Sequence, residues 1–165
     1  MKTVFMNGLG MHLHGEVPVD GSNAPELNLV AQDLSELTLD SFKGSRVVLN
    51  IFPSMDTEVC AASVRRFNAD AAKLPNTKVI CVSMDLPFAA TRFCTANGIE
   101  NVVTGSGFRS EFGDKYGVRI VDGPLRDLYA RAVVVIDEEG KVLGSKVCEQ
   151  ITDEPDYAFV ESLLK

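Results

Sequence analysis

Three short apolar runs constrain the fold of this chain more than any other feature. Arg46–Phe52 (RVVLNIF), Lys78–Met84 (KVICVSM) and Arg131–Asp137 (RAVVVID) are rich in Val and Ile and show little alternation of apolar and polar residues. A strand with one solvated face alternates, whereas a strand covered on both faces does not. The three runs therefore predict central strands of a sheet that is covered by helices on both sides.

Helical segments follow the first two runs. Thr57–Leu74 has apolar residues at helical spacing and is followed by Pro75, and Phe88–Asn97 is followed by Gly98, so each predicts a helix. The remaining predicted elements are shorter: hairpin strands at Thr3–Met6 and Met11–His14 around an Asn7–Gly8 turn, strands at Leu27–Val30, Val102–Val103 and Lys141–Glu149, and helices at Ser110–Tyr116 and Glu154–Lys165, the last with Pro155 at its first position.

The order of these elements predicts the fold class. Strand–helix–strand–helix, followed by a helix, a β-hairpin and a last helix, gives an α/β fold with a central mixed β-sheet flanked by helices. This arrangement resembles the thioredoxin fold, with residues 1–15 as an N-terminal β-hairpin extension. A chain of 165 residues is too short for two ordinary domains, so we expect one domain over residues 1–165.

Composition narrows the possible functions. The chain is 45% hydrophobic and 24% charged, as is typical of a globular protein. No apolar run approaches the roughly 20 residues of a membrane span. Residues 1–15 lack the pattern of a signal peptide, so we expect a cytoplasmic protein. A formal net charge of −7 disfavours nucleic acids and anionic membranes as partners.

The four cysteines are the candidate reagents of the chain. They are Cys60, Cys81, Cys94 and Cys148, and no two of them form the close CxxC pair that is common in zinc sites. Free cysteine is among the most buried residue types, so each is first expected to be an unreactive core side chain. We keep that expectation for Cys81, in the middle of an apolar run, and we expect Cys148, near the end of the last strand, to be a spectator thiol.

Cys60 has a different context. It follows the loop Pro53–Val59, directly after a buried strand, and such loops are where α/β folds bind ligands. We expect the side chain of Asp56 or Thr57 to cap the next helix, which places Cys60 in the first helical turn. Backbone N–H dipoles at that position favour the thiolate, which is the nucleophilic form.

Ionisation alone gives a limited gain in rate. A few per cent of an ordinary thiol is ionised at pH 7, so full ionisation speeds its reactions by about thirtyfold at most. Faster chemistry needs donors that orient a reacting group and stabilise its departing charge. Thr57 is the nearby candidate and Arg131 the distant one. A helix cap for Thr57 and a solvated strand end for Arg131 stay open as alternatives.

Longer motifs carry a resemblance to a known family. Asn50–Asn68 (NIFPSMDTEVCAASVRRFN) resembles the active-site signature of bacterial thiol peroxidases, the atypical two-cysteine branch of the peroxiredoxins, and Ser83–Cys94 (SMDLPFAATRFC) resembles the resolving-cysteine helix of that branch. Gly123–Leu125, Ala130–Asp137 and Thr152–Tyr157 match as well, in the same order along the chain.

The resemblance implies a reaction cycle. Cys60 is implied to reduce hydrogen peroxide and alkyl hydroperoxides and to become a sulfenic acid, which Cys94 of the same chain resolves as a disulfide. Thr57 and Arg131 are implied to bind the peroxide oxygens, and Pro53 to shield the sulfenate. The resemblance also implies thioredoxin as reductant, a homodimer, an antioxidant role in cell redox homeostasis, and no metal or organic cofactor.

Cys94 also has a structural alternative, because its neighbour Phe93 favours a place in the core. A disulfide requires Cα atoms within about 7 Å, which two intact helices need not provide. We therefore predict that the first turn around Cys60, and the helix around Cys94, unwind after oxidation. A pocket made by Pro53, Met55, Phe88 and nearby apolar residues is expected to suit alkyl hydroperoxides.

Two other functions stay open. A disulfide oxidoreductase that acts on proteins would have the same fold, but such enzymes usually carry CxxC, and Thr57 stands where the first of those cysteines would be. A non-enzymatic binding domain would have four unreactive thiols. His12 and His14 alternate onto one strand face, which suggests either a weak metal chelate or, as we expect, a solvated hairpin edge.

Overall fold

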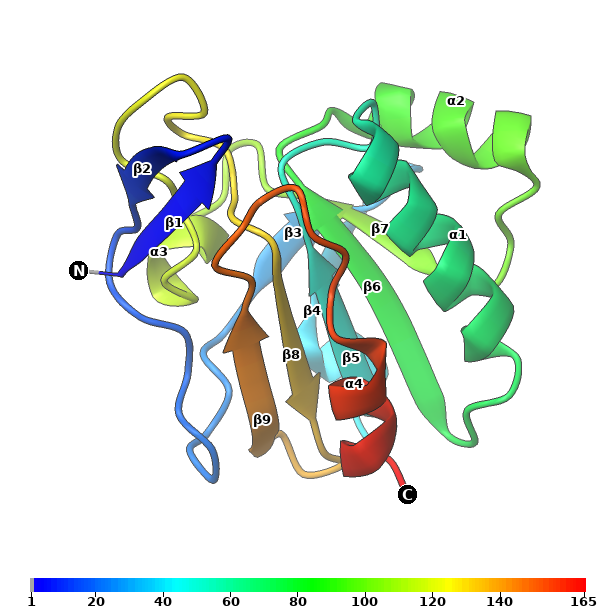
Figure 1. Cartoon of the computed structure of the whole chain (residues 1–165). Coiled ribbons are helices and arrows are strands. Elements are labelled where there is room, and N and C mark those ends of the chain that lie inside the picture. The colour runs from blue at the N-terminus through cyan, green and yellow to red at the C-terminus, as the bar shows by residue number, and fades with distance from the viewer. Residues whose placement is uncertain (1) are drawn as a thin grey trace.

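The computed structural model describes residues 2–165, and its centre is a mixed sheet of seven strands in the order β4-β3-β7-β6-β5-β8-β9 (Figure 1). The strands are β3 (Asn28–Val30), β4 (Glu36–Thr38), β5 (Arg46–Ile51), β6 (Thr77–Ser83), β7 (Val103–Ser106), β8 (Ala132–Ile136) and β9 (Val142–Val147). β5, β6 and β7 run parallel to one another, and the other neighbouring pairs are antiparallel. The predicted α/β class with a mixed central sheet is confirmed.

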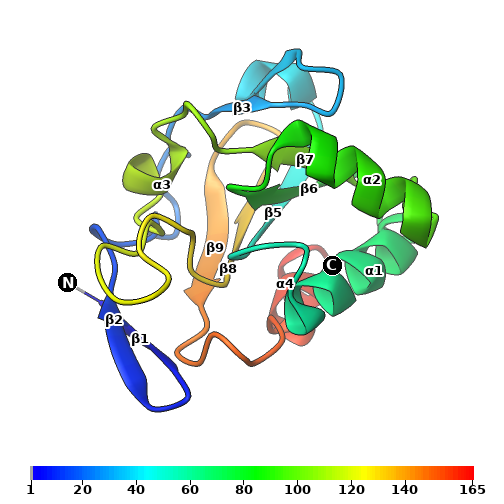
Figure 2. The same ribbon diagram turned by 90° about the horizontal axis from the view of Figure 1, so that it is seen from above.

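Helices cover both faces of this sheet (Figures 1 and 2). α1 (Glu58–Ala71), α2 (Pro87–Asn97) and α4 (Tyr157–Leu163) pack on one face, and the short α3 (Phe112–Lys115) packs on the other. Successive strand residues point to opposite sides of the sheet. Val48 therefore packs on the side of α1, α2 and α4, whereas Val47 and Leu49 pack on the side of α3. This double burial explains why the central strands lack polar alternation.

The N-terminal hairpin forms a separate two-stranded sheet of β1 (Thr3–Met6) and β2 (Leu9–His12). Asn7 and Gly8 both have positive φ, at 52° and 86°, which is typical of a two-residue hairpin turn. The second strand therefore begins at Leu9, and the prediction of Met11–His14 was shifted. Met1, part of the predicted extension, lies outside the described residues.

Several other predicted boundaries were wrong. α1 ends at Ala71 rather than at Leu74, and β7 continues to Ser106. Pro155 is not the first residue of the last helix, because Asp156 is its N-cap and accepts a hydrogen bond from the Phe159 N–H at 3.0 Å. The edge strand β4 and the 3-10 helix η1 (Leu39–Phe42) were missed, since segments of three or four residues carry no readable period.

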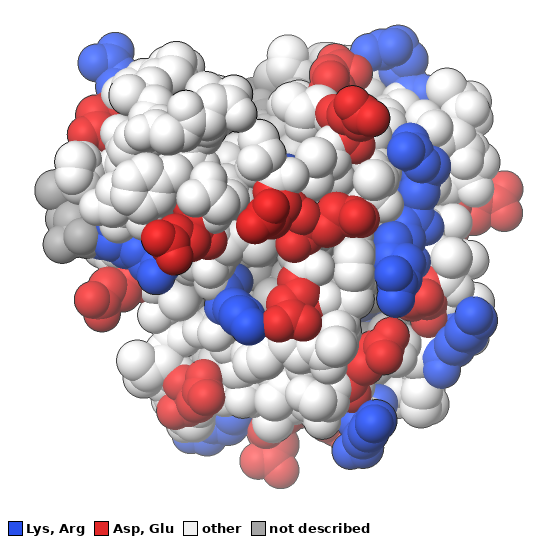
Figure 3. All heavy atoms as spheres, viewed as in Figure 1, with Lys and Arg blue, Asp and Glu red and all other residues white. Residues whose placement is uncertain are grey.

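Charge is distributed unevenly over the face shown in Figure 3. Acidic side chains gather over the segment that joins β9 to α4, and basic side chains follow α1. This face has no broad basic surface of the kind that binds nucleic acids. Within residues 2–165, no helix combines the length and apolar character that a bilayer crossing requires.

Candidate active site

The loop between β5 and α1 carries the candidate nucleophile. β5 and β6 are parallel neighbours, so the segments that follow them meet at the same edge of the sheet. Pro53 is buried directly after β5, and α1 begins at Glu58 with Thr57 as its N-cap residue. Cys60 lies in the first turn of α1, as predicted, and is 1% exposed.

The cap of α1 differs from the prediction. The Thr57 hydroxyl does not bond to the N–H groups of the first turn and instead donates to the Ser54 carbonyl at 2.8 Å. The Asp56 carboxylate pairs with Arg92 at 3.4 Å. The hydroxyl proton of Thr57 is thus in use, and its oxygen can accept a hydrogen bond from a bound molecule. The dipole at the helix start acts on Cys60 without a capping side chain.

Arg131 reaches Cys60 from far along the chain. β8 pairs with β5 so that Ala132 lies opposite Ile51, which brings Arg131, just before β8, beside the loop that follows β5. Its Nη2 donates to the Cys60 Sγ at 3.1 Å, and its Nε donates to the Ile151 carbonyl at 2.9 Å. Arg131 is 1% exposed, so the alternative of a solvated strand end is wrong.

The Arg131 guanidinium is buried without a carboxylate partner. None of the ion pairs within residues 2–165 includes it, and its Nη1 has no hydrogen-bond partner there. A buried unpaired charge is costly, so the guanidinium favours an anion or a strong hydrogen-bond acceptor beside it. The free Nη1 can donate to an oxygen atom beside the sulfur.

Cys60 and Arg131 line a small pocket of about 230 Å³. Pro53 lines it, as predicted, but Met55 is 3% exposed within the core and Phe88 is 67% exposed outside the pocket, so that part of the predicted pocket was wrong. The apolar wall comes instead from the hairpin and from two loops, through Met6, Leu125 and Ile151. Sequence patterns gave no signal for these three residues, because they meet only through loop packing.

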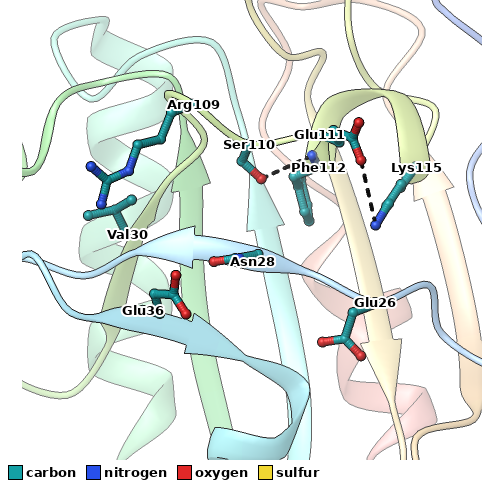
Figure 4. A pocket seen from close by; sticks show the side chains of 9 residues that line it. All are labelled: Glu26, Asn28, Val30, Glu36, Arg109, Ser110, Glu111, Phe112 and Lys115. Atoms are coloured by element: carbon teal, nitrogen blue, oxygen red, sulfur yellow. Dashed lines mark hydrogen bonds and ion pairs between the residues drawn. The ribbon is translucent and has the colours of Figure 1, made fainter.

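A larger hollow of about 450 Å³ lies elsewhere (Figure 4). It is lined by charged side chains of both signs, including Glu26, Glu36 and Arg109, and Lys115 pairs with Glu111 at 3.8 Å. These charged side chains are exposed, and no thiol lines the hollow. Exposed charges are solvated, so the greater volume of this hollow does not identify it as the active site, and the smaller Cys60 pocket is the better candidate.

Comparisons with known proteins identify the family of the chain. The family model described as Redoxin matches residues 19–160. The thiol peroxidase of Corynebacterium glutamicum is 53% identical over 143 residues, which cover 87% of each chain. The chain belongs to the thiol peroxidases of the Redoxin family. The resemblance seen in the sequence is confirmed, and the protein is a thiol-dependent peroxidase of the peroxiredoxin type.

More distant relatives support the family and the fold. The thiol peroxidase of Mycobacterium tuberculosis is 48% identical over 157 residues, covering 95% of this chain and 94% of the relative. The crystal structure of a peroxiredoxin-like protein from Aquifex aeolicus matches with a TM-score of 0.93 and 40% identity, covering 99% of this chain and 96% of that one. The predicted thioredoxin-like fold is confirmed.

The other three thiols of this thiol peroxidase lie in different surroundings. All four cysteines are free thiols. Cys94 is a buried residue of α2, and burial raises its pKa. The Gln32 amide, 3.6 Å from its sulfur, lowers the pKa by a smaller amount. Burial raises the pKa of Cys81 to about 12 and also raises the pKa of Cys148. Cys81 is fully buried, as predicted, and among these thiols only Cys60 accepts a hydrogen bond from a guanidinium.

The two histidines do not form a pair. His12 Nδ1 lies 2.6 Å from the Asp122 carboxylate, and His14 Nδ1 lies 3.5 Å from the Asp114 carboxylate. His14 falls outside β2, so the two rings do not share a strand face. Both rings are about half exposed and lie next to different acids, which fits the expected solvated edge better than a shared chelate.

Proposed function

We propose that Cys60 is the peroxidatic nucleophile of this peroxidase and that Cys94 of the same chain is its resolving partner. The observation that carries the proposal is the buried Arg131 guanidinium, 3.1 Å from the Cys60 sulfur through Nη2 and unpaired at Nη1. This arrangement supports both a stable thiolate and a ready donor for the charge that develops on a leaving oxygen.

In the first half of the cycle, the Cys60 thiolate attacks one oxygen of the hydroperoxide. An S–O bond forms as the O–O bond breaks, the sulfur is oxidised to sulfenate, and the other oxygen leaves with its electron pair and takes a proton as water or alcohol. Thr57 and Arg131 bind the two oxygens. The Thr57 oxygen accepts the peroxide hydrogen because its own proton is donated to Ser54. Pro53 shields the sulfenate from solvent.

In the second half, the Cys94 thiolate attacks the Cys60 sulfenic acid, so an S–S bond forms and water leaves. Cys60 and Cys94 are held in separate helices, and we propose that the first turn of α1 and the segment around Cys94 unwind to bring them together. The raised pKa of buried Cys94 supports this order, because a buried, protonated thiol is a poor nucleophile. Thioredoxin then supplies two electrons and restores both thiols.

The pocket wall supports alkyl hydroperoxides as substrates beside hydrogen peroxide. Met6, Leu125 and Ile151 offer apolar contacts next to Cys60. Each CH₂ group that a substrate buries contributes about 0.8 kcal/mol, so a few carbon atoms produce a clear preference. This preference depends on side chains of the hairpin and the loops, and not on Met55 and Phe88, which the sequence had predicted.

We further propose a cytoplasmic antioxidant enzyme that acts as a homodimer of one domain over residues 1–165, with residues 1–15 as an extension. A disulfide that forms and is reduced in every cycle suits a reducing compartment. The homodimer follows from the resemblance to the atypical two-cysteine peroxiredoxins.

A coupled assay tests the proposal. Hydroperoxide, thioredoxin, thioredoxin reductase and NADPH are mixed with the protein, and peroxide loss is followed together with NADPH oxidation. We expect turnover with the unaltered chain and none with Cys60→Ser. In parallel, reduction of insulin disulfides measures the rival activity on proteins. Insulin reduction without peroxide consumption would overturn the proposal in favour of a protein disulfide oxidoreductase.

A further inference from the structure

One carboxylate joins the loop of the candidate nucleophile to the segment that leads into α2. Asp85 lies between β6 and α2, two residues before Pro87. Its Oδ1 accepts a hydrogen bond from the Ser54 hydroxyl at 2.7 Å, and its Oδ2 accepts from the Met55 N–H at 2.7 Å. The Ser83 hydroxyl donates to Oδ2 at 2.8 Å. Asp85 thus holds the loop after β5 and the end of β6 with one side chain.

These contacts continue from Asp85 to the start of α1. The Ser54 carbonyl accepts from the Thr57 hydroxyl at 2.8 Å and from the Thr57 N–H at 3.2 Å, and the Ser54 hydroxyl oxygen accepts from the Asp56 N–H at 3.2 Å. Thr57 is the N-cap residue of the turn that contains Cys60. Fixing Ser54 therefore fixes both the Thr57 hydroxyl and the first turn of α1.

The bonds to Asp85 are of the strong kind. Hydrogen bonds to an ionised acceptor are shorter and about twice as strong as neutral ones, and the distances at Asp85 fit that class. Asp85 is half-buried, and its partners Met55 and Ser83 are buried, so water competes poorly for them. An exposed ion pair such as that of Asp56 with Arg92 contributes much less.

We propose that Asp85 is a positioning residue that holds the Cys60 turn in its folded, peroxide-reactive form and must release the loop before the disulfide forms. This inference rests on the proposed function, since it needs a Cys60–Cys94 disulfide. The Cys60 sulfenate has two fates. After taking a proton it condenses as the sulfenic acid with the Cys94 thiol, which gives the disulfide and water, or as the sulfenate it attacks a second hydroperoxide, which gives a sulfinate and an alcohol. Asp85 slows the first fate and so gives the second more time.

The substitution Asp85→Asn tests this role at constant size. The amide replaces one acceptor oxygen by a donor group and removes the charge, so the Ser54 hydroxyl or the Met55 N–H loses its acceptor. The chain contains no tryptophan, so the steps are followed by quenched flow, alkylation and mass spectrometry rather than by tryptophan fluorescence. Three quantities are measured: the rate of Cys60 oxidation, the rate of disulfide formation and the sulfinate fraction at increasing peroxide.

We expect the oxidation rate to fall several-fold and the rate of disulfide formation to rise by on the order of tenfold, the size of one charge-assisted hydrogen bond. In Asp85→Asn, the peroxide concentration at which half of the Cys60 residues become sulfinate should rise by the same factor. General damage to the fold would slow both steps, whereas the proposal predicts opposite signs. If Asp85→Asn does not fold, Ser54→Ala removes only the hydroxyl bond and is expected to shift the same ratio by a smaller factor.

Asn68→Ala is the matched control. Asn68 lies on α1, and its Oδ1 accepts from the N–H groups of Glu100 and Asn101 at 3.1 and 2.7 Å, so it joins the far end of α1 to the segment after α2. We expect its ratio of disulfide to sulfinate to match the unaltered chain. An equal shift in both variants, or no shift with Asp85→Asn, would overturn the role of Asp85. An unaltered chain that forms no Cys60–Cys94 disulfide would instead overturn the proposed function.

Discussion

Cys60 and Cys94 belong to the same apolar cluster and lie on neighbouring helices, but their surroundings differ in charge. Cys60 lies at the start of α1, accepts a hydrogen bond from a buried guanidinium and lines a pocket. Cys94 lies near the C-terminal end of α2, and its polar neighbour is the neutral amide of Gln32. Burial alone raises the pKa of Cys94. Burial therefore makes a thiol inert unless a cation and a helix start accompany it.

This difference supports the proposal that the two thiols act at different times in the cycle. We propose that Cys60 reacts first with the peroxide and that buried Cys94 reacts only after the local structure opens. In this proposal the disulfide forms only after peroxide has oxidised Cys60 to the sulfenic acid, because two thiols do not join without an oxidant. Substitutions at the thiols, at Arg131 and at Thr57 test this contrast.

Replacing either thiol should have different consequences. With Cys60→Ser, we expect peroxide consumption to fall to the uncatalysed background, because the nucleophile is gone. With Cys94→Ser, the first equivalent of peroxide still oxidises Cys60, but turnover with thioredoxin stops. Single-equivalent titration and steady-state assays separate the two. Cys148→Ser is the control, with less than about a twofold change in rate. Stoichiometric oxidation by Cys60→Ser would contradict the assignment.

The guanidinium should have the next largest effect. We expect Arg131→Met to lower the second-order rate of Cys60 oxidation by about 10²–10³, the loss typical of one missing charge-stabilising donor. Because no carboxylate within residues 2–165 pairs with Arg131, its loss leaves no buried carboxylate without a partner, and the free energy of unfolding should not fall in parallel. Arg131→Lys keeps the charge but loses the two-pronged geometry of the guanidinium. Its rate of Cys60 oxidation should lie between those of the unaltered chain and of Arg131→Met. A rate within about tenfold of the unaltered chain for Arg131→Met would show that the contact is not used.

Thr57 should contribute less than Arg131. Thr57→Val keeps the shape and removes the hydroxyl, and we expect the rate of Cys60 oxidation to fall by about tenfold, the size of one hydrogen bond in the transition state. Thr57→Ser restores the hydroxyl and should recover most of the rate. Equal loss in both variants would indicate that the methyl group, and not the oxygen, matters.

The smallest effect concerns pH. Since burial raises the pKa of Cys94, its thiolate fraction should keep rising above pH 8.5, the ordinary range of a thiol. Alkylation of Cys94 in the reduced, folded protein should therefore increase further between about pH 8.5 and 10. In urea-unfolded protein the same reaction should level off near the ordinary value. Mass spectrometry of the alkylated peptides gives both pH profiles of Cys94. Superimposable profiles for the folded and the unfolded protein would contradict a raised pKa of Cys94 in the fold.

The sequence predicted the elements that local patterns specify, and it failed where distant segments meet. The central strands were found because double burial leaves a continuous apolar run, as in Arg46–Ile51. Arg131 was proposed from a motif, although 71 residues separate it from Cys60. Asp85 lies within the motif Ser83–Cys94, but the sequence gave it no role, since its bonds to Ser54 and Met55 are non-local, spanning 31 and 30 residues.

The pocket wall and the cap were the weakest predictions for similar reasons. Met6 reaches the pocket because the hairpin is held to the body by the Phe5 N–H, which donates to the Glu149 carbonyl at 2.8 Å. No pattern in residues 1–15 indicates that contact. The predicted side-chain cap of α1 was wrong because the Thr57 hydroxyl had two possible partners, the N–H groups of the first turn and the Ser54 carbonyl. It donates its proton to the Ser54 carbonyl.

Mass spectrometry after one equivalent of hydroperoxide tests the proposed pairing of Cys60 with Cys94. The reduced protein is oxidised once, its remaining thiols are blocked, and the peptides are mapped without reduction. We predict a Cys60–Cys94 bridge within one chain, with Cys81 and Cys148 recovered as free thiols. A bridge between the Cys60 residues of two chains, a bridge to Cys148, or an unmodified Cys60 would contradict the account.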